Sequence, residues 1–330
     1  MTADEIVRDP RLLLHRVDSV HRKLEFRPTS AEAVREAAFI DGRTDIWAGS
    51  PLQLPFDAVV DLSTAAPAPA IFHMSFCGST LLARLLDIPG KVLALKEPNC
   101  LVDLADWKTG GGGAEFKAML RFTLTMLGRS WGTSEQILLK PSSWANNLID
   151  DFPGAMRAVF VTIDRDRFLE AVLRGGTDRV AFAARLAAHL SPFVDGGPER
   201  VQAAIDSTPD PIGKAARLAL VAHDLELRLF ERALGGNQLA RAEIVDFSEI
   251  EREPFEATTR AGQALELGLD SRDIQHNIDR WAGSNAKADA EFSAEQRQSE
   301  NSAVRVAYGS LMDSSLAWAE QALGPATLQT

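Results

Sequence analysis

The feature that most constrains this chain of 330 residues is a short apolar run that passes through a turn of small residues into leucines at helical spacing. The apolar run covers residues 70–74, the turn covers residues 75–80, and the leucines follow from residue 81. This order predicts a buried strand, a tight loop and a helix. Such a loop directs several backbone N–H groups toward one point, and the helix dipole adds to the positive field there. The loop therefore suits a phosphate or a sulfate, although an ordinary strand-to-helix turn with Ser79 as the N-cap gives the same pattern.

The candidate anion-binding residues of this loop are small or lie in the first turn of the expected helix. Gly78 lets the backbone approach a ligand closely, because it has no Cβ atom. Ser79 and Thr80 add hydroxyl groups that can donate hydrogen bonds. Together with the backbone N–H groups of Cys77 and Leu81, they form the expected anion site.

Four further apolar runs follow the first and alternate with helical patterns, which predicts an α/β fold with a mostly parallel central sheet flanked by helices. The expected strands are residues 70–74, 92–96, 136–140, 157–163 and 242–247. Extra helices are expected at both ends of the chain. They cover residues 9–41, where Leu12, Val17 and Leu24 form one stripe, and residues 270–323. We therefore expect a helical and connecting segment over residues 1–66, packed on an α/β domain over residues 67–330.

Charged residues stand at the ends of two of these strands. Lys96 and Lys140 are the last residues of the second and third strands, and Glu97 follows Lys96. Pro98 disfavours helix at Glu97 and keeps it in an extended turn. Because ligands of open α/β sheets bind at the carboxyl ends of strands, Glu97 is expected to share a crevice with the loop. The alternatives are a solvated carboxylate and lysines that reach out to solvent.

The composition disfavours several classes of protein. A net charge of −11 is unusual for a general nucleic-acid binder, which usually carries a basic face. Two cysteines do not suggest a disulfide framework, and six scattered histidines do not suggest a structural metal. The first residues lack a signal-peptide pattern, and no apolar run reaches the length of a membrane span. We therefore expect a cytoplasmic protein that has no metal and no membrane or nucleic-acid partner.

Several stretches resemble the sulfotransferase family, in particular its bacterial members. Residues 75–82, Ser-Phe-Cys-Gly-Ser-Thr-Leu-Leu, are similar to the family's Arg-Ser-Gly-Thr-Thr loop, which holds the 5′-phosphosulfate of PAPS (3′-phosphoadenosine 5′-phosphosulfate). Glu97 stands where the protein-tyrosine branch of the family has a glutamate base. Residues 244–254 and 265–269 resemble the family's YEDL…DP…FLGL stretch, and residues 152–161 resemble the strand before its 3′-phosphate site.

The resemblance implies a P-loop-like sulfotransferase fold and transfer of a sulfuryl group from PAPS to a hydroxyl or amine of a small-molecule acceptor. PAP would be the product, and no metal is implied. Glu97 would be the base, and residues Cys77 to Leu81 would hold the phosphosulfate. Lys140 would supply the positive charge, with Lys96 as the second choice.

The chain departs from the family at two places. Phe76 stands where the family loop has Arg or Lys, and the family's Arg…Ser pair, which grips the 3′-phosphate, falls on Ile163 and Ala171. The candidates to replace this pair are Arg165, Arg167, Arg174 and Lys287. Guanidinium groups at the end of a strand can hold a phosphate, although a charge run of this kind is usually a solvated helix start.

Three other functions fit parts of the sequence. A non-catalytic nucleotide- or anion-binding protein on the same fold is the main alternative, because fold alone does not fix function. A P-loop kinase is disfavoured, because its loop needs a lysine and none lies between Ile71 and Ile88. A cysteine phosphatase would use a thiolate at a helix start. It is disfavoured because six residues, and not five, separate Cys77 from Arg84.

Overall fold

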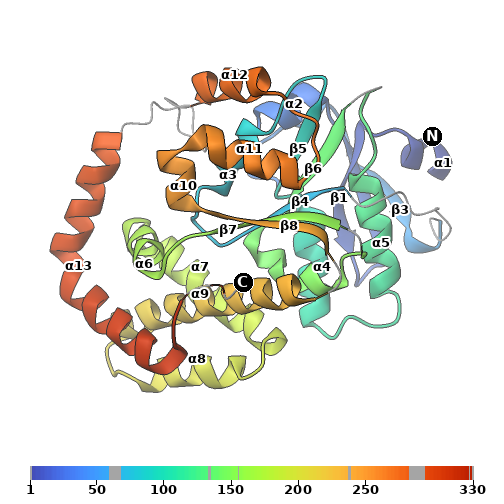
Figure 1. Ribbon diagram of the computed structural model, residues 1–330. Helices are drawn as coiled ribbons and strands as arrows, with labels where there is room; N and C mark the ends of the chain where they lie inside the picture. Colours follow the sequence, from blue (N-terminus) through green and yellow to red (C-terminus); the bar gives the residue numbers. More distant parts are fainter. Residues whose placement is uncertain are drawn as a thin grey trace.

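The computed structural model describes residues 2–58, 68–132, 135–154, 156–236, 239–281, 294–326 and 328, with residues 294–298 as backbone only. Its centre is a five-stranded sheet in the order β5-β6-β4-β7-β8, in which all neighbouring strands are parallel (Figure 1). The strands are β4 (Ala70–His73), β5 (Val92–Lys96), β6 (Gln136–Lys140), β7 (Met156–Thr162) and β8 (Leu239–Asp246). The expected α/β class and all five expected strands are confirmed.

The order of the strands predicts a ligand-binding crevice beside β4. The chain leaves β4 for β5 and returns to β6, which pairs with both of them, and it then crosses to β7 on the other side of β4. The direction of winding therefore reverses at β4. In open α/β sheets, ligands bind outside the carboxyl ends of the strands at such a reversal.

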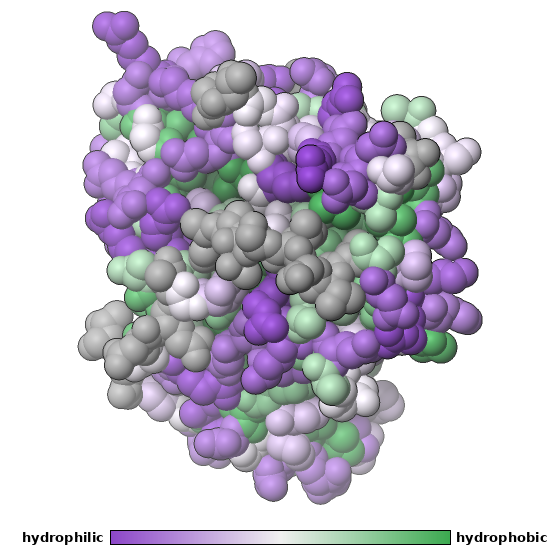
Figure 2. Space-filling model, turned by 90° about the vertical axis from the view of Figure 1, so that its right-hand side faces the viewer, coloured by the Kyte–Doolittle hydropathy of each residue, from purple (hydrophilic) through white to green (hydrophobic). Residues whose placement is uncertain are grey.

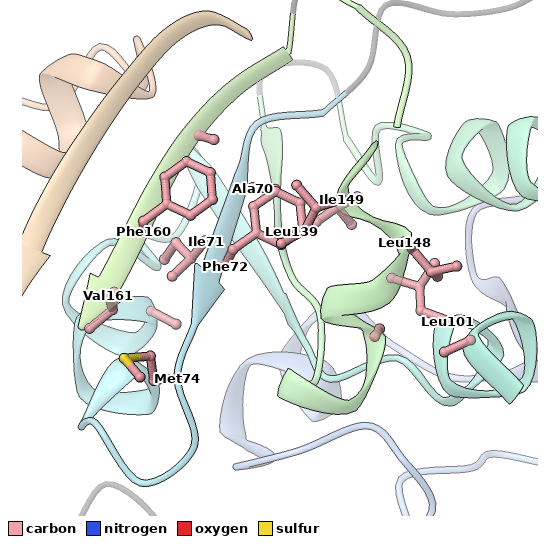
Figure 3. Packing of buried hydrophobic residues seen from close by; sticks show 14 of the residues in the cluster. Ala70, Ile71, Phe72, Met74, Leu101, Leu139, Leu148, Ile149, Phe160 and Val161 are labelled. Carbon is pink, nitrogen blue, oxygen red and sulfur yellow. The ribbon is translucent and has the colours of Figure 1, made fainter. Parts of the chain in front are cut away.

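The core under this crevice is aromatic and aliphatic. Figure 3 shows Ile71 and Phe72 on β4 between Phe160 on β7 and Ile149 on the 3₁₀ helix η2 (Ser143–Asp151). The rings of Phe72 and Phe160 are stacked with centroids 5.6 Å apart. Parallel strands are covered on both faces, so their sequences are continuous apolar runs. This is why β4 to β7 could be recognised, whereas β8, at the edge of the sheet, is mostly only partly buried and includes Arg241 and Glu243.

Helices cover both faces of the sheet (Figure 1). One face carries α3 (Ser79–Leu85), α11 (Pro254–Ala264) and α12 (Ser271–Trp281), and the other carries α4 (Asn99–Thr109), α7 (Gly176–Leu190), α8 (Gly197–Asp206) and α9 (Pro211–Gly235). The remaining long helices are α5 (Phe116–Leu127), α6 (Arg165–Arg174) and α13 (Ala294–Leu323), and a short α10 (Phe247–Arg252) follows β8. Asn277 of α12 donates to the carbonyl groups of Arg84, Leu85 and Asp87, which lie at the end of α3, at 3.0–3.1 Å. These bonds satisfy helix-end carbonyls that have no partner within α3.

The expectation of helices over residues 9–41 is wrong for most of that segment. β1 (Leu12–Asp18) and β2 (Lys23–Pro28) form an antiparallel hairpin, and β3 (Leu52–Pro55) adds a third strand. Only α2 (Ala31–Glu36), capped by Ser30, matches the expectation within this range, and α1 (Ala3–Arg8) precedes it. Leu12, Leu13 and Leu14 are all buried, because α4 and α5 pack on β1. The strand therefore lacks the alternation that would have identified it.

The face that carries the N-terminal sheet is mostly hydrophilic, with small, separate apolar patches (Figure 2). The expected boundary between residues 66 and 67 lies in residues 59–67, outside the described part of the chain. Among the helices that the structure describes, none is both long enough and apolar enough to cross a bilayer.

One arginine ties the N-terminal segment to the rest of the molecule. Arg129, just after α5, donates to the carbonyl groups of Val7, Asp9 and Leu12 at 2.5, 2.9 and 2.8 Å. Burial lowers its pKa to about 10, so the side chain stays charged at neutral pH. Bonds from a charged donor are stronger than those between neutral groups. Arg129 therefore fixes α1 and β1 against α5.

We predict that Arg129→Gln lowers the free energy of unfolding by about 2–4 kcal/mol, because several carbonyl groups lose a charged donor. Urea denaturation followed by circular dichroism measures the change. Arg121→Gln, on the exposed face of α5, is the control and should stay within about 0.5 kcal/mol of the wild type. Equal stability of the two variants would show that Arg129 does not anchor the N-terminal segment.

Candidate functional site

Each strand of the parallel sheet ends in a polar residue. These last residues are His73, Lys96, Lys140, Thr162 and Asp246. Because the strands are parallel, the five residues lie along one edge of an otherwise apolar sheet. This edge is where the strand order predicts a ligand site.

Glu97 and Lys140 form an ion pair at this edge. The Nζ atom of Lys140 donates to Oε1 of Glu97 at 2.7 Å, and Nη2 of Arg43 donates to Oε2 at 3.2 Å. The side chain of Lys140 is fully buried, and that of Glu97 is 13% exposed. From the sequence, Glu97 was expected to share a crevice with the loop and Lys140 to supply positive charge from another strand end, and the structure shows the two side chains in contact. Arg43, from the segment before β3, was not expected there.

The backbone fixes the position of this pair. Lys96 and Lys140 are register partners in β5 and β6, and the N–H of Glu97 donates to the carbonyl oxygen of Lys140 at 2.6 Å. Glu97 has a left-handed conformation with φ of 58°, which is unfavourable for a residue with a side chain. Such local strain is found most often at functional sites.

His73 lies against the same lysine. Its Nε2 atom is 3.0 Å from Nζ of Lys140, 3.0 Å from the carbonyl oxygen of Pro141 and 3.9 Å from Oε1 of Glu97. Its Nδ1 atom is 2.9 Å from the carbonyl oxygen of Met74. The imidazole therefore connects the end of β4 to the end of β6.

The charges around Glu97 keep it ionised. Burial alone would raise its pKa, but the positive charges of Lys140, His73 and Arg43 and the hydrogen bond from Lys140 lower the pKa from 4.5 to about 2. An opposite charge at this distance favours the charged form of a carboxyl group. Glu97 is therefore a carboxylate at neutral pH, and the positive charges that lower its pKa also make it a weaker base.

The loop between β4 and α3 has two residues in the left-handed conformation. Phe76 has φ of 63° and Gly78 has φ of 73°. A Cβ atom on Gly78 would lie 2.4 Å from the ring of Phe247, so only glycine fits here. Within the described part of the chain, the backbone N–H groups of Phe76, Cys77, Gly78 and Thr80 donate to no carbonyl or side-chain oxygen. Four donors in one short loop are available to an anion.

Buried side chains hold the start of this loop. The hydroxyl groups of Ser75 and Ser143 are 2.8 Å apart, which connects the loop to η2. The N–H of Ser75 donates to Glu226 of α9 at 3.4 Å, and Asn146 donates to the other oxygen of Glu226 at 3.2 Å. Burial raises the pKa of Glu226 well above its ordinary value. The two oxygens of Glu226 thus hold the start of the loop to α9 and to η2.

The other expected loop residues are mostly buried. Ser79 and Thr80 are about 4% and 3% exposed, and Cys77 is 1% exposed. Burial raises the pKa of the Cys77 thiol to about 11, although the charge of Lys140 opposes this shift. A neutral, buried thiol does not act as a nucleophile. Lys140 is close to the start of the loop, because its Nζ atom lies 3.0 Å from His73, the last residue of β4.

Phe76, at the position where the resemblance implies a cation, belongs to an aromatic cluster. Its ring centroid is 6.1 Å from that of Phe168 and 6.0 Å from that of Phe182, and Arg179 lies over the ring at 5.0 Å. Phe182 also contacts Trp144 of η2, at 6.0 Å. The loop itself therefore contributes no charged side chain from position 76, and an apolar wall lies beside it.

Lys96, Arg165 and Arg167 make their contacts elsewhere. Nζ of Lys96 donates to the carbonyl oxygen of Arg35 at 2.9 Å and lies 3.5 Å from Asp87, and burial lowers its pKa to about 8. Arg165 donates to the carbonyl oxygen of Gly324 at 3.0 Å and lies 4.0 Å from Asp224 of α9. Arg167 pairs with Glu251 of α10 at 2.7 Å. Lys287 lies outside the described residues.

A separate groove of about 700 Å³ lies between the β1–β2 hairpin and α4. Its walls include Arg16, His21, Asp103 and Trp107, and neither the loop nor the pair of Glu97 and Lys140 contributes to it. In the described part of the chain, no group of three or more His, Cys, Asp or Glu side chains is arranged to hold a metal ion.

Three residues of the site were not found from the sequence. His73 ends a buried strand, and its position next to Lys140 follows only from the pairing of β4 with β6. Arg43 lies in a connecting segment rich in glycine and proline, which carries no periodic pattern. Glu226 lies within α9, on a face that is otherwise apolar. A charged residue among buried leucines is the one signal that could have identified Glu226.

No known protein family matches this chain, and no curated protein is similar enough to be a relative. The function must therefore be argued from the site itself.

We predict that Glu97→Gln loses about 3 kcal/mol of stability at pH 7, because it leaves the buried Lys140 without its carboxylate. Because the pKa of Glu97 is lower in the folded chain than its ordinary 4.5, its contribution is complete above about pH 5 and is lost as the pH falls toward 2. The difference between variant and wild type should therefore shrink over this range. Urea denaturation at a series of pH values measures it.

Glu266→Gln is the matched control. Glu266 also has positive φ and pairs with Arg157 at 2.8 Å, but its side chain is 59% exposed. This variant should change stability by less than about 0.5 kcal/mol at every pH. A pH-independent loss in Glu97→Gln would contradict the assignment of the ion pair.

Proposed function

We propose that the chain is a sulfotransferase, which moves a sulfuryl group from PAPS to a hydroxyl or amine of a small-molecule acceptor. One observation carries the proposal. A loop with unpaired backbone N–H groups, the Lys140 ammonium and the Glu97 carboxylate meet at the carboxyl ends of β4, β5 and β6. Sulfuryl transfer needs these three functions, which are an anion cradle, positive charge at the transferring oxygens and a base for the acceptor.

The residues of the loop fit the phosphosulfate end of PAPS. The N–H groups of Phe76, Cys77, Gly78 and Thr80 have no acceptor in the described part of the chain, so they are available to the anionic oxygens of a ligand. The 3′-phosphate end has less support. Arg165 and Arg167 are held by Gly324 and Glu251, and Lys287 lies outside the described residues. The proposal therefore rests on the phosphosulfate end.

The roles of the side chains follow from their positions. PAPS, when bound, supplies an activated sulfuryl group. Glu97 is ionised at neutral pH and accepts the proton of the acceptor hydroxyl. Lys140 and the loop N–H groups donate hydrogen bonds to anionic oxygens. Because Lys140 is fully buried, its charge acts through a medium of low dielectric constant, where it is more effective than in water.

We predict that Gly78→Ala weakens the binding of PAP at least about tenfold, because a Cβ atom would collide with Phe247 and distort the N–H cradle. Isothermal titration calorimetry with PAP measures the affinity. Gly268→Ala is the matched control, since Gly268 also has positive φ, of 64°, but has no heavy atom within 4 Å of an added Cβ. Wild-type affinity in Gly78→Ala would show that the loop does not hold the nucleotide.

We predict that Glu97→Gln retains PAP affinity within about threefold but loses at least about 100-fold in sulfuryl transfer, because it removes the base. Transfer from PAPS to a panel of phenols, alcohols and amines measures the second effect. Full activity of this variant would refute the assignment of Glu97.

The same measurements on the wild type separate the alternatives. PAP binding with no transfer to any acceptor of the panel would support a non-catalytic binding protein. Binding of ATP with magnesium in place of PAP would support a kinase.

A further inference from the structure

The Glu97 carboxylate lies between two cations that differ in their freedom to move. Lys140 holds Oε1 from a fully buried position, whereas Arg43 holds Oε2 with a side chain that is 59% exposed. The bond from Arg43 is single and has a length of 3.2 Å. An exposed ion pair of this kind contributes little to stability. Arg43 can therefore leave Glu97 at small cost.

The base of the Arg43 side chain is nevertheless held in place. Its N–H and its Nε atom both donate to Asp41, at 3.1 and 2.6 Å, and its guanidinium lies over the ring of Phe39 at 3.9 Å. The N–H of Ile40 donates to the carbonyl oxygen of Lys96 at 2.8 Å, which fixes this segment beside the end of β5. These contacts fix the position of the Nη1 and Nη2 atoms of Arg43 beside Glu97.

The ring of Phe39 lies near both Arg43 and Lys140. Nζ of Lys140 lies 6.0 Å from the centroid of Phe39, on whose ring Arg43 stacks. Lys140 and Arg43 therefore act on the same small volume, next to Glu97. Within the described residues, Nη1 of Arg43 donates to no acceptor. A planar guanidinium with free N–H groups suits the oxygens of a sulfate or phosphate group.

We propose that Arg43 is a second anion-binding cation of this site. Without nucleotide it binds Glu97, and with nucleotide it binds the transferable anionic group instead. The inference rests on the proposed function. It also accounts for Phe76, because the cation that the loop lacks would come from the N-terminal segment. When Arg43 turns to the anion, Glu97 loses one of its positive partners. Burial then opposes its charge more effectively, so Glu97 becomes a stronger base when the nucleotide is bound.

The test compares two nucleotides that differ in the transferable group. Isothermal titration calorimetry without acceptor measures the affinity of the full-length protein for PAPS, which carries the sulfuryl group, and for PAP, which lacks it. We expect Arg43→Gln to weaken PAPS binding about tenfold and to leave PAP binding within about twofold of the wild type. Arg43→Lys should restore part of the PAPS affinity, because it restores the charge.

Arg11→Gln is the matched control. Arg11 pairs with Asp9 through its N–H and its guanidinium, as Arg43 does with Asp41, and it is 73% exposed. This variant should bind both nucleotides as the wild type does. Equal PAPS affinity of Arg43→Gln and the wild type would overturn the role of Arg43 and leave the proposed function intact. A wild type that binds neither nucleotide would overturn both.

Discussion

The buried ammonium of Lys140 is the constraint on which this site depends. A charge at the end of a buried strand is costly unless a counter-charge and hydrogen bonds compensate for it. Glu97 provides both, and it can do so because the parallel register places Lys96 beside Lys140 and the next residue at hydrogen-bonding distance. The turn that brings the carboxylate back over β6 requires positive φ at Glu97. The strain at Glu97 and the position of Lys140 are thus two consequences of one requirement, that a buried cation has a partner.

The loop beside this pair is shaped by elements that are distant in the sequence. Phe247, after β8, leaves no room for a side chain at residue 78, and Glu226, on α9, holds the N–H of Ser75. The aromatic cluster around Phe76 fixes the side of the loop that faces α6 and α7. These contacts leave the N–H groups of Phe76, Cys77, Gly78 and Thr80 without an acceptor in the described chain, whereas the N–H of Leu81 donates to Gly78. A binding site for an anion can therefore form on a protein whose net charge is −11, because the field that an anion meets is local.

One physical reason explains why the parallel sheet was predicted correctly from the sequence and the N-terminal sheet was not. Strands buried on both faces, such as β4 to β7, are continuous apolar runs. β8 is only partly buried, but like the other four it is bounded by helical patterns that make the α/β order clear. β1 is also a continuous apolar run at Leu12 to Leu14, but its turn to β2 contains no Gly, Pro or Asn. Arg22 takes positive φ there instead, at 54°. Without a turn signal, the leucines were compatible with a helix, and only packing against α4 and α5 decided the outcome.

In the site, too, residues at strand ends could be found from the sequence, whereas residues positioned by tertiary contacts could not. Glu97 and Lys140 could be placed together because both stand at strand ends, a position that the chain order reveals. Arg43, by contrast, reaches Glu97 across 54 residues of chain, and the contacts that position it, with Asp41, Phe39 and the end of β5, are tertiary. Arg165 and Arg167 stand at a strand end too, yet Asp224 and Glu251 lie close enough to bind them. Position at the sheet edge therefore brings a charge near the crevice, but the competing partners decide whether it faces a ligand. By that criterion Glu97 decides the state of both Lys140 and Arg43, because its carboxylate is the acceptor that each of them contacts.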